Sequence, residues 1–153
     1  MENTVGLEIA DALGLLLRRS ARAHLYRDLT VEIAEGLDEL TYPVLSGLAR
    51  TGPRSAADLA PEVGLDRSGV TRRASQLESA GLVRREPDPA DRRASLLLLT
   101  DAGERAVAAT RSRLAARITA SLNSWPPEEA RAFARQLHRF TTEGPFGQAP
   151  AGS

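Results

Sequence analysis

Residues 55–100 constrain the fold more than any other part of the chain. They read SAADLAPEVGLDRSGVTRRASQLESAGLVRREPDPADRRASLLLLT. Two short amphipathic helical patterns are followed by two apolar runs of strand-like composition, which a charged loop joins. This order predicts a mainly α fold with a small β-hairpin wing, the layout of a winged helix-turn-helix.

Both helical patterns carry their own start signals. Ser55 precedes the first one, and Asp58 follows three residues later, which completes a capping-box pattern. Gly64 ends this helix, because glycine readily takes the left-handed conformation. Asp66 is the expected cap of the second helix.

The second helix has two contrasting faces. Its apolar stripe is expected to be buried and comprises Val70, Ala74, Leu77 and Gly81. The opposite face carries Ser68, Arg72, Ser75 and Ser79, with Arg67 and Thr71 at its margin. Small hydroxyls allow a close backbone approach to DNA, and arginine can donate two hydrogen bonds to guanine in the major groove. The alternative is an ordinary surface helix with solvated arginines.

The following segment predicts a hairpin with a charged tip. Residues 82–86 and 95–99 have strand composition, and the loop PDPADRRA contains two prolines that favour a turn. Its cations are Arg84, Arg85, Arg92 and Arg93, and its acids are Glu86, Asp88 and Asp91. Such a wing can follow a phosphate backbone while one arginine enters the minor groove. A solvated hairpin with local ion pairs is the competing interpretation.

Three motifs in this region resemble the MarR family of bacterial transcription regulators. They are VTR followed by Leu77, the run SAGLVRREPDPADRR, and LLLLTDAGERA. The resemblance extends over roughly residues 13–140, and the family's D-x-R wing motif falls on residues 91–93. It implies that Arg93 reaches the minor groove and that Asp91 helps to orient it. It also implies that the major groove is addressed by Ser68, Thr71 and Arg72.

The chain departs from the family pattern at Arg73, where an apolar residue is usual. By helical angle Arg73 flanks the buried stripe, so its stem is expected to lie on the core and its head to reach a phosphate. The complete set of predicted DNA-binding residues is Arg67, Ser68, Thr71, Arg72, Arg73, Ser75, Arg84, Asp91, Arg92 and Arg93.

Composition limits the chemistry of the chain. It has no cysteine, which excludes disulfides, thiolate catalysis and a thiol-based redox sensor. The formal net charge is zero. Residues 1–49 carry four arginines and eight acids, whereas residues 50–99 carry nine arginines and seven acids. This polarity agrees with DNA binding by the central region.

No catalytic or cofactor motif stands out. His24 and His138 are far apart and belong to no metal-binding motif, and there is no P-loop, dinucleotide fingerprint or nucleophile elbow. We therefore expect neither an enzyme nor a bound cofactor or metal. No apolar run approaches the length of a membrane span and no signal pattern opens the chain, so we expect a cytoplasmic protein without a membrane partner.

Helical patterns flank the winged region. One long helix is expected over residues 7–29, and another over residues 37–50 with Thr41 as cap and Pro43 in its first turn. After the wing, Thr100 is expected to cap a helix that reaches about residue 123. A last helix follows Pro127, and its expected buried side comprises Ala130, Phe133, Ala134, Leu137 and Phe140.

These patterns predict four segments. Residues 1–36 and 101–143 are expected to form N- and C-terminal dimerisation helices around a DNA-binding domain at residues 37–100, with a disordered tail at residues 144–153. The terminal helices carry more apolar surface than one small domain needs, which favours a twofold homodimer. The alternative is that they cover the core of their own chain. A dimer predicts a pseudo-palindromic operator in double-stranded DNA.

The family resemblance also implies a regulatory pocket between the dimerisation helices and the winged domain. Its candidate residues are Arg22, His24, Tyr26 and Tyr42, for which ordinary interface packing is the alternative role. The sequence therefore predicts a dimeric, sequence-specific DNA-binding transcription regulator, a repressor that a small aromatic or lipophilic effector releases. Two other classes compete with this interpretation, a winged-helix protein-interaction module and a small ligand-binding or enzymatic dimer.

Overall fold

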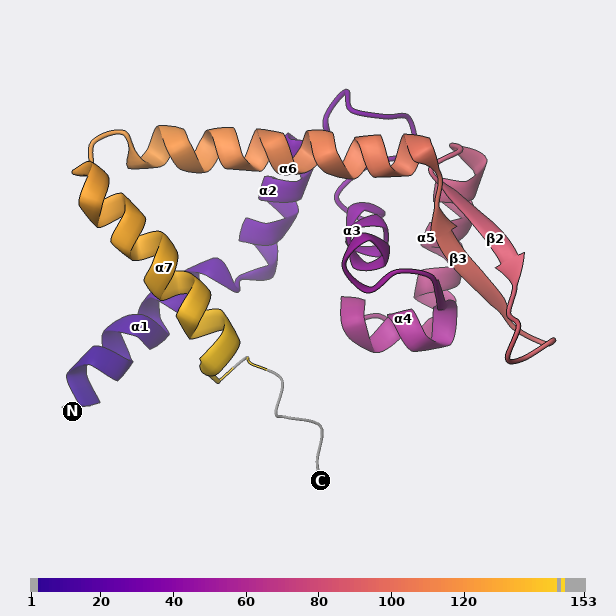
Figure 1. Ribbon diagram of the computed structural model, residues 1–153, viewed down its shortest axis with the longest axis horizontal. Coiled ribbons are helices and arrows are strands. Elements are labelled where there is room, and N and C mark those ends of the chain that lie inside the picture. The colour runs from indigo at the N-terminus through magenta and orange to yellow at the C-terminus, as the bar shows by residue number, and fades with distance from the viewer. Residues whose placement is uncertain (1–2, 146, 148–153) are drawn as a thin grey trace. The chain divides into compact units, whose positions relative to one another are not determined.

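The computed structural model describes residues 3–145 and 147 of the chain. It divides into two compact units, residues 1–114 and residues 115–153, with the boundary inside one continuous helix. In chain order (Figure 1), the elements are α1 (Asn3–Leu16), α2 (Arg19–Thr30), α3 (Tyr42–Thr51), β1 (Arg54–Ser55), α4 (Ala56–Val63), α5 (Arg67–Ser79), β2 (Val83–Pro87), β3 (Ser95–Leu99), α6 (Asp101–Leu122) and α7 (Pro127–Glu143). The predicted mainly helical fold with a β-hairpin wing is confirmed.

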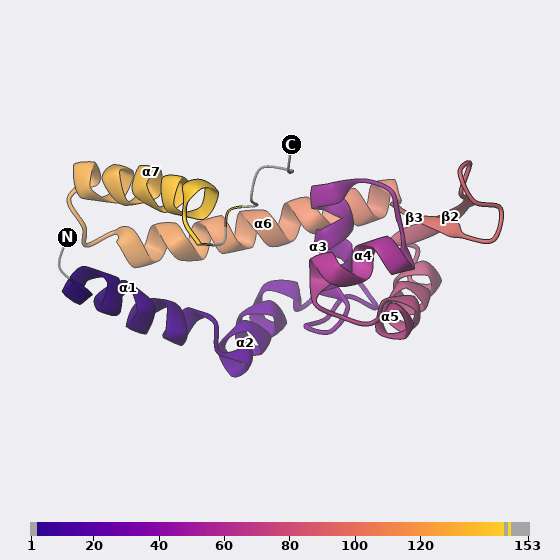
Figure 2. The ribbon, with the colours of Figure 1, turned by 90° about the horizontal axis from the view of Figure 1, so that it is seen from below.

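The sheet has three antiparallel strands in the order β1-β3-β2. The hairpin pairs Val83 with Leu99 and Pro87 with Ser95, one residue later on the first strand than predicted. Figure 2 shows this hairpin extending away from α3, α4 and α5. The two-residue strand β1 was not predicted, because its short sequence lies in a stretch that reads as a turn. It pairs with the middle of β3.

The core of the winged part comes from α3, α4, α5 and β3. Its fully buried side chains include Leu45, Leu59, Val70, Leu77 and Leu97. The caps predicted at Ser55 and Thr100 are also present. The Ser55 hydroxyl accepts the Asp58 N–H at 3.1 Å, and the Thr100 hydroxyl accepts the Gly103 N–H at 3.1 Å. Local start signals in the sequence therefore set where these helices begin.

The predicted apolar stripe of α5 is wrong at Gly81. Val70, Ala74 and Leu77 are buried, but α5 ends at Ser79, and Gly81 is exposed. Gly81 has a φ of 75°, in the left-handed region that suits glycine. It belongs to the turn that leads into β2, so it does not lie on the helix stripe.

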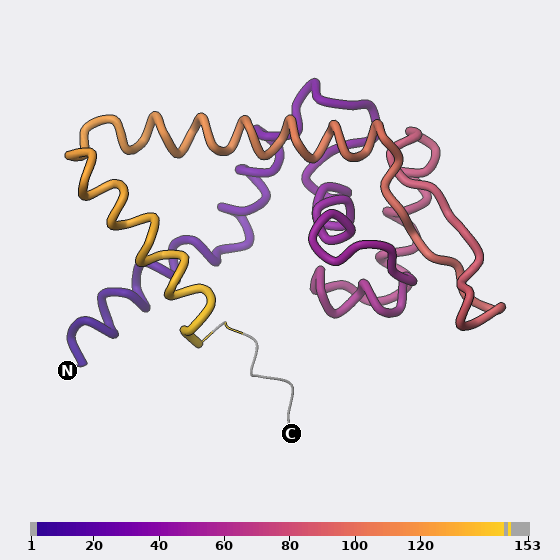
Figure 3. The backbone as a smooth tube through the Cα atoms, viewed as in Figure 1, coloured from indigo at the N-terminus to yellow at the C-terminus, as the bar shows by residue number. Residues whose placement is uncertain are grey.

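The single long helix expected over residues 7–29 is wrong, because the chain forms two helices there. Figure 3 shows the change of direction between α1 and α2. Arg18 has an extended conformation with φ −58° and ψ 130°, which ends the helical path. Neither Leu17 nor Arg18 is a proline or glycine, so neither residue signals this break in the sequence.

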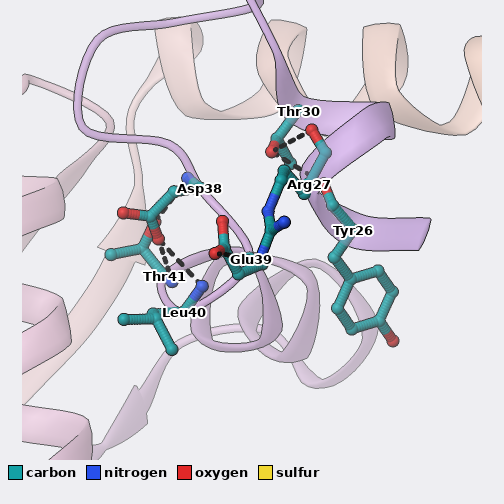
Figure 4. A network of polar contacts seen from close by, with 7 residues as sticks. All are labelled: Tyr26, Arg27, Thr30, Asp38, Glu39, Leu40 and Thr41. Atoms are coloured by element: carbon teal, nitrogen blue, oxygen red, sulfur yellow. Dashed lines mark hydrogen bonds and ion pairs between the residues drawn. The ribbon is translucent and has the colours of Figure 1, made fainter. Parts of the chain in front are cut away.

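Helix α3 begins five residues later than predicted, at Tyr42 instead of Leu37. The preceding residues form a turn around Asp38, whose Oδ1 accepts the N–H groups of Leu40 at 2.8 Å and Thr41 at 2.9 Å (Figure 4). Thr41 occupies the cap position, but its side chain makes no capping hydrogen bond to the helix. The carboxylate of Asp38 satisfies amides that a longer helix would have used.

Thr41 is fully buried, and its hydroxyl is expected to contribute to the stability of the fold. It donates to the Gly36 carbonyl at 2.9 Å and accepts the Asp38 N–H at 3.0 Å. We expect Thr41→Val to lower the free energy of unfolding by about 1–3 kcal/mol, because both partners lose their hydrogen bond. Denaturant titration measures this change. As a control, Thr51→Val removes a partly exposed hydroxyl bonded to the Gly47 carbonyl and is expected to cost less than about 1 kcal/mol. Equal effects of both variants would contradict this assignment.

The second unit contains the end of α6 and all of α7. The predicted buried side of α7 is not buried within the single chain, where Phe133 is 44% and Leu137 46% exposed. Trp125 packs on Phe133 with ring centroids 5.5 Å apart. Most of the tail predicted to be disordered, residues 146 and 148–153, lies outside the described residues.

Candidate nucleic-acid interface

Helix α5 presents the predicted major-groove face to solvent. Its N-terminus is capped by Asp66, whose Oδ1 accepts the Gly69 N–H at 2.6 Å. The buried stripe of α5 packs in the core, and the residues exposed on other sides of the helix include Arg67, Ser68, Arg72 and Ser75. The cap and the core therefore hold this polar surface in a defined orientation.

Two hydroxyls of α5 are already bonded within the helix. Thr71 donates to the Arg67 carbonyl and Ser75 donates to the Thr71 carbonyl, each at 2.9 Å. Their oxygens keep acceptor capacity, but their protons are used. Among the described residues, no hydrogen bond or ion pair engages the guanidinium of Arg72. Arg72 is therefore an exposed long donor on α5 that remains available for a base edge.

The wing tip is ordered by its own backbone. Asp88 N–H donates to the Ala94 carbonyl and Ala94 N–H donates to the Asp91 carbonyl, both at 3.1 Å. The Oδ1 of Asp91 accepts the backbone N–H of Arg93 at 2.9 Å. Asp91 therefore holds the backbone of Arg93, and the side chains of Arg92 and Arg93 are exposed at the tip.

The two arginines of β2 have different surroundings. Arg84 is exposed and forms an ion pair with Glu86 on its own strand. Arg85 reaches α5, where its Nε lies 3.2 Å from the Glu78 Oε2 and a terminal nitrogen donates to the Ser75 hydroxyl at 3.2 Å. The sequence argument did not identify this link. The signal was the strand period of two, which puts Arg85 on the same face as the buried Val83.

Arg73 lies on the wall of a pocket of about 520 Å³ in the first unit. The pocket walls come from α2, the turn before α3, α3 itself, the end of α4, and α5. Four arginines and two glutamates line it, namely Arg19, Arg22, Arg50, Arg73, Glu39 and Glu62. The predicted contact of Arg73 with a DNA phosphate stays a prediction. In the structure the residue lines this pocket.

The pocket has an excess of positive charge. Arg50 donates to the Ser46 hydroxyl at 2.9 Å, and Glu39 accepts from Arg27 at 3.3 Å. Within the described part of the chain, no ion pair or hydrogen bond engages the other three lining guanidinium groups, those of Arg19, Arg22 and Arg73. This arrangement suits an acidic group of a small molecule.

The four predicted effector residues are not all brought together. Arg22 and Tyr26 line the pocket, whereas His24 is exposed and does not. Tyr42 is buried next to Tyr26, with ring centroids 5.1 Å apart in an edge-to-face arrangement. Burial raises the pKa of the Tyr42 hydroxyl above its usual value. Tyr42 therefore supports one wall of the pocket from within the core.

Among residues 3–145 and 147, no group of three or more histidine, aspartate or glutamate side chains is placed to hold a metal ion. In the same part of the chain, no helix is both long and apolar enough for a membrane crossing.

Comparisons with known proteins agree with this geometry. The model of the MarR family matches residues 35–94, from the turn before α3 to the wing tip. The chain is 29% identical over 140 residues to the uncharacterized HTH-type transcriptional regulator YxaD of Bacillus subtilis, covering 91% of this chain and 95% of YxaD. A solved MarR family transcription regulator is similar with a TM-score of 0.69 and 25% identity, over 92% of this chain and 93% of that one.

A further solved structure is the PcaV transcriptional regulator of Streptomyces coelicolor. It is 30% identical, with a TM-score of 0.57, over 85% of this chain and 95% of PcaV. The chain belongs to the MarR family. As a MarR-family protein it is a DNA-binding transcription regulator and not an enzyme. The resemblance inferred from the sequence motifs is confirmed.

Proposed function

We propose that this MarR-family regulator is a homodimeric, sequence-specific repressor that a small molecule releases from its operator. The proposal of DNA binding rests on one observation. Arg72 on α5 and Arg93 at the wing tip are both exposed and belong to the same compact unit. A recognition helix and an adjacent cationic hairpin can address a major groove and the neighbouring minor groove together.

Each predicted contact has a distinct chemical role in this proposal. Ser68, Thr71 and Arg72 read base edges in the major groove, with Arg72 donating to guanine. Arg93 enters the minor groove, where narrow A·T-rich segments attract cations. The remaining exposed cations, Arg67, Arg84 and Arg92, contact phosphates and supply affinity without base preference.

The apolar surface of the terminal helices supports a dimer. Exposed apolar side chains of the first unit include Val5, Leu7, Ile9, Leu15, Leu16 and Leu17, and those of the second include Ile118, Trp125, Phe133 and Leu137. Large exposed apolar surfaces on soluble proteins often mark protein–protein interfaces. We assign residues 1–36 and 101–143 to dimerisation and residues 37–100 to DNA binding. A twofold dimer places two recognition helices on an inverted repeat.

The arginine-lined pocket is the proposed effector site. The PcaV structure has also been solved in complex with that protein's natural ligand. In this chain Tyr26 offers an aromatic surface and Arg22 a free guanidinium, so we propose an aromatic effector that carries an acidic group. Because α2 and α5 both line the pocket, a ligand there can favour one orientation of the recognition helix.

Salt-dependent binding tests the proposed function against a protein-interaction role. We expect mobility-shift assays to show specific binding that weakens steeply between 50 and about 200 mM salt, because arginine–phosphate contacts release counterions. A winged domain that binds only other proteins would show no salt-dependent DNA binding at any concentration tested, and that result would overturn the proposal.

The effector site makes a separate prediction. Benzoate, used as a simple aromatic acid, is expected to lower operator affinity in the wild type, and Arg22→Ala is expected to weaken this effect about tenfold. The control is His24→Ala, on the same helix but outside the pocket, which should respond like the wild type. Isothermal titration calorimetry measures the binding of benzoate, and competition mobility-shift assays measure the resulting loss of operator affinity. If Arg22→Ala and His24→Ala weakened the response to benzoate equally, the assignment of the pocket as the effector site would be contradicted.

A further inference from the structure

Arg85 occupies a position between the wing and the recognition helix that DNA contact alone does not explain. Its backbone lies in β2, paired with Leu97 of β3. Its side chain is 30% exposed and turns toward α5. The neighbouring Arg84 is 51% exposed and contacts only Glu86 on the same strand among the described residues.

The guanidinium of Arg85 contacts two positions one helical turn apart on α5. Its Nε lies 3.2 Å from the Glu78 Oε2, and its terminal nitrogen donates to the Ser75 hydroxyl at 3.2 Å. Ser75 in turn donates to the Thr71 carbonyl. A planar guanidinium offers its donors at fixed angles, so two simultaneous partners restrict both its position and its tilt. The contacts therefore link one strand of the wing to the C-terminal half of the recognition helix.

We propose that Arg85 is a positioning residue for operator binding, and we name the group formed by Arg85, Ser75 and Glu78 the wing clasp. The clasp sets the angle between the hairpin and α5, so that Arg72 and Arg93 meet adjacent grooves together. Partly exposed ion pairs contribute little to folding, and the main effect of the clasp is on geometry. In this arrangement Ser75 supports the hairpin and does not contact a base, because its hydroxyl donates to the Thr71 carbonyl and accepts from Arg85.

This inference rests on the proposed DNA-binding function. Its test compares Arg85→Ala with the matched control Arg84→Ala, which removes the same charge from the adjacent residue. We expect Arg85→Ala to lower operator affinity about tenfold at fixed salt while leaving the slope of log affinity against log salt unchanged, because no phosphate contact is lost. Arg84→Ala should instead reduce the magnitude of that slope by about one.

A double-mutant cycle with Arg93→Ala separates positioning from general weakening. When the clasp is intact, Arg93→Ala is expected to cost about tenfold in affinity. In the Arg85→Ala background, we expect that cost to fall below about threefold, because the wing is no longer held at its groove. Among the described residues, no hydrogen bond or ion pair joins the side chains of Arg85 and Arg93, so any coupling between them must act through the position of the wing, and additive losses would overturn the proposal.

Thermal unfolding of the variants and DNA binding by the wild type are the controls for this experiment. Thermal unfolding of each variant should stay within about 4 °C of the wild type. Glu78→Gln, which removes the ion pair but keeps the side-chain shape, is the second variant if Arg85→Ala does not fold, and it should show the same reduced cost of Arg93→Ala. Wild-type affinity in Arg85→Ala, or a loss of salt slope equal to that of Arg84→Ala, would overturn the clasp alone. Absence of DNA binding by the wild type would overturn the proposed function and the clasp with it.

Discussion

Replacing Arg72 with alanine is expected to lower operator affinity by about ten- to a hundredfold, which corresponds to roughly 1–3 kcal/mol. Arg72 is exposed on α5 and makes no hydrogen bond or ion pair with another described residue, so its loss should leave thermal unfolding unchanged. The loss should also relax base preference at one position of each half-site, because the lost hydrogen bonds go to a base edge. Titrations against operators substituted at single positions measure both effects.

The matched control for Arg72 is Arg105→Ala, an exposed arginine at the start of α6. It removes the same charge from the same unit and should change affinity by no more than about twofold. Arg93→Ala is expected to weaken binding without the same change in major-groove base preference. If Arg72→Ala and Arg93→Ala both retained full affinity at moderate salt, the assignment of the interface would be wrong.

Introducing a charge into the apolar face of α7 is expected to have a still larger effect. Leu137→Glu should convert the protein to monomers and reduce operator affinity by more than about a hundredfold, since both the paired contacts and the apolar interface are lost. No residue of α7 is buried within the single chain, so the winged unit should remain folded. Sedimentation velocity gives the oligomeric state, and circular dichroism checks the fold.

Leu40→Glu is the control for that substitution. Leu40 is an apolar side chain, 56% exposed, in the turn before α3, outside the two segments assigned to dimerisation. This variant should remain dimeric and bind the operator like the wild type. The proposed dimer would be contradicted if Leu137→Glu remained dimeric with full affinity.

Local chemistry explains why much of the winged region could be predicted from the sequence. Ser55, Asp66 and Thr100 cap helices within three residues of themselves, so their roles depend on sequence neighbours alone. The hairpin was predictable for a similar reason, because apolar runs on both sides of a proline-containing loop pair with each other. An error of one residue in β2 is small since the same side chains face the same neighbours.

Some of the features that were not predictable depend on contacts distant in sequence. The late start of α3 follows a loop in which Gly36 has a φ of 76° and lies so close to Ala80 that an added Cβ would be 2.7 Å away. The pocket environment of Arg73 depends on α2, about fifty residues earlier, and the break before α2 has no proline or glycine to announce it. The contact of Arg85 with α5 likewise required the relative placement of a strand and a helix.

Selection of bound sequences from random double-stranded DNA, followed by hydroxyl-radical footprinting, tests the central claim most directly. We predict an inverted repeat whose half-sites are about 10 base pairs apart, with one dimer bound and with minor-groove protection next to each half-site. Recovery of a single unrepeated site bound by one chain, or of no enriched sequence at all, would contradict the account.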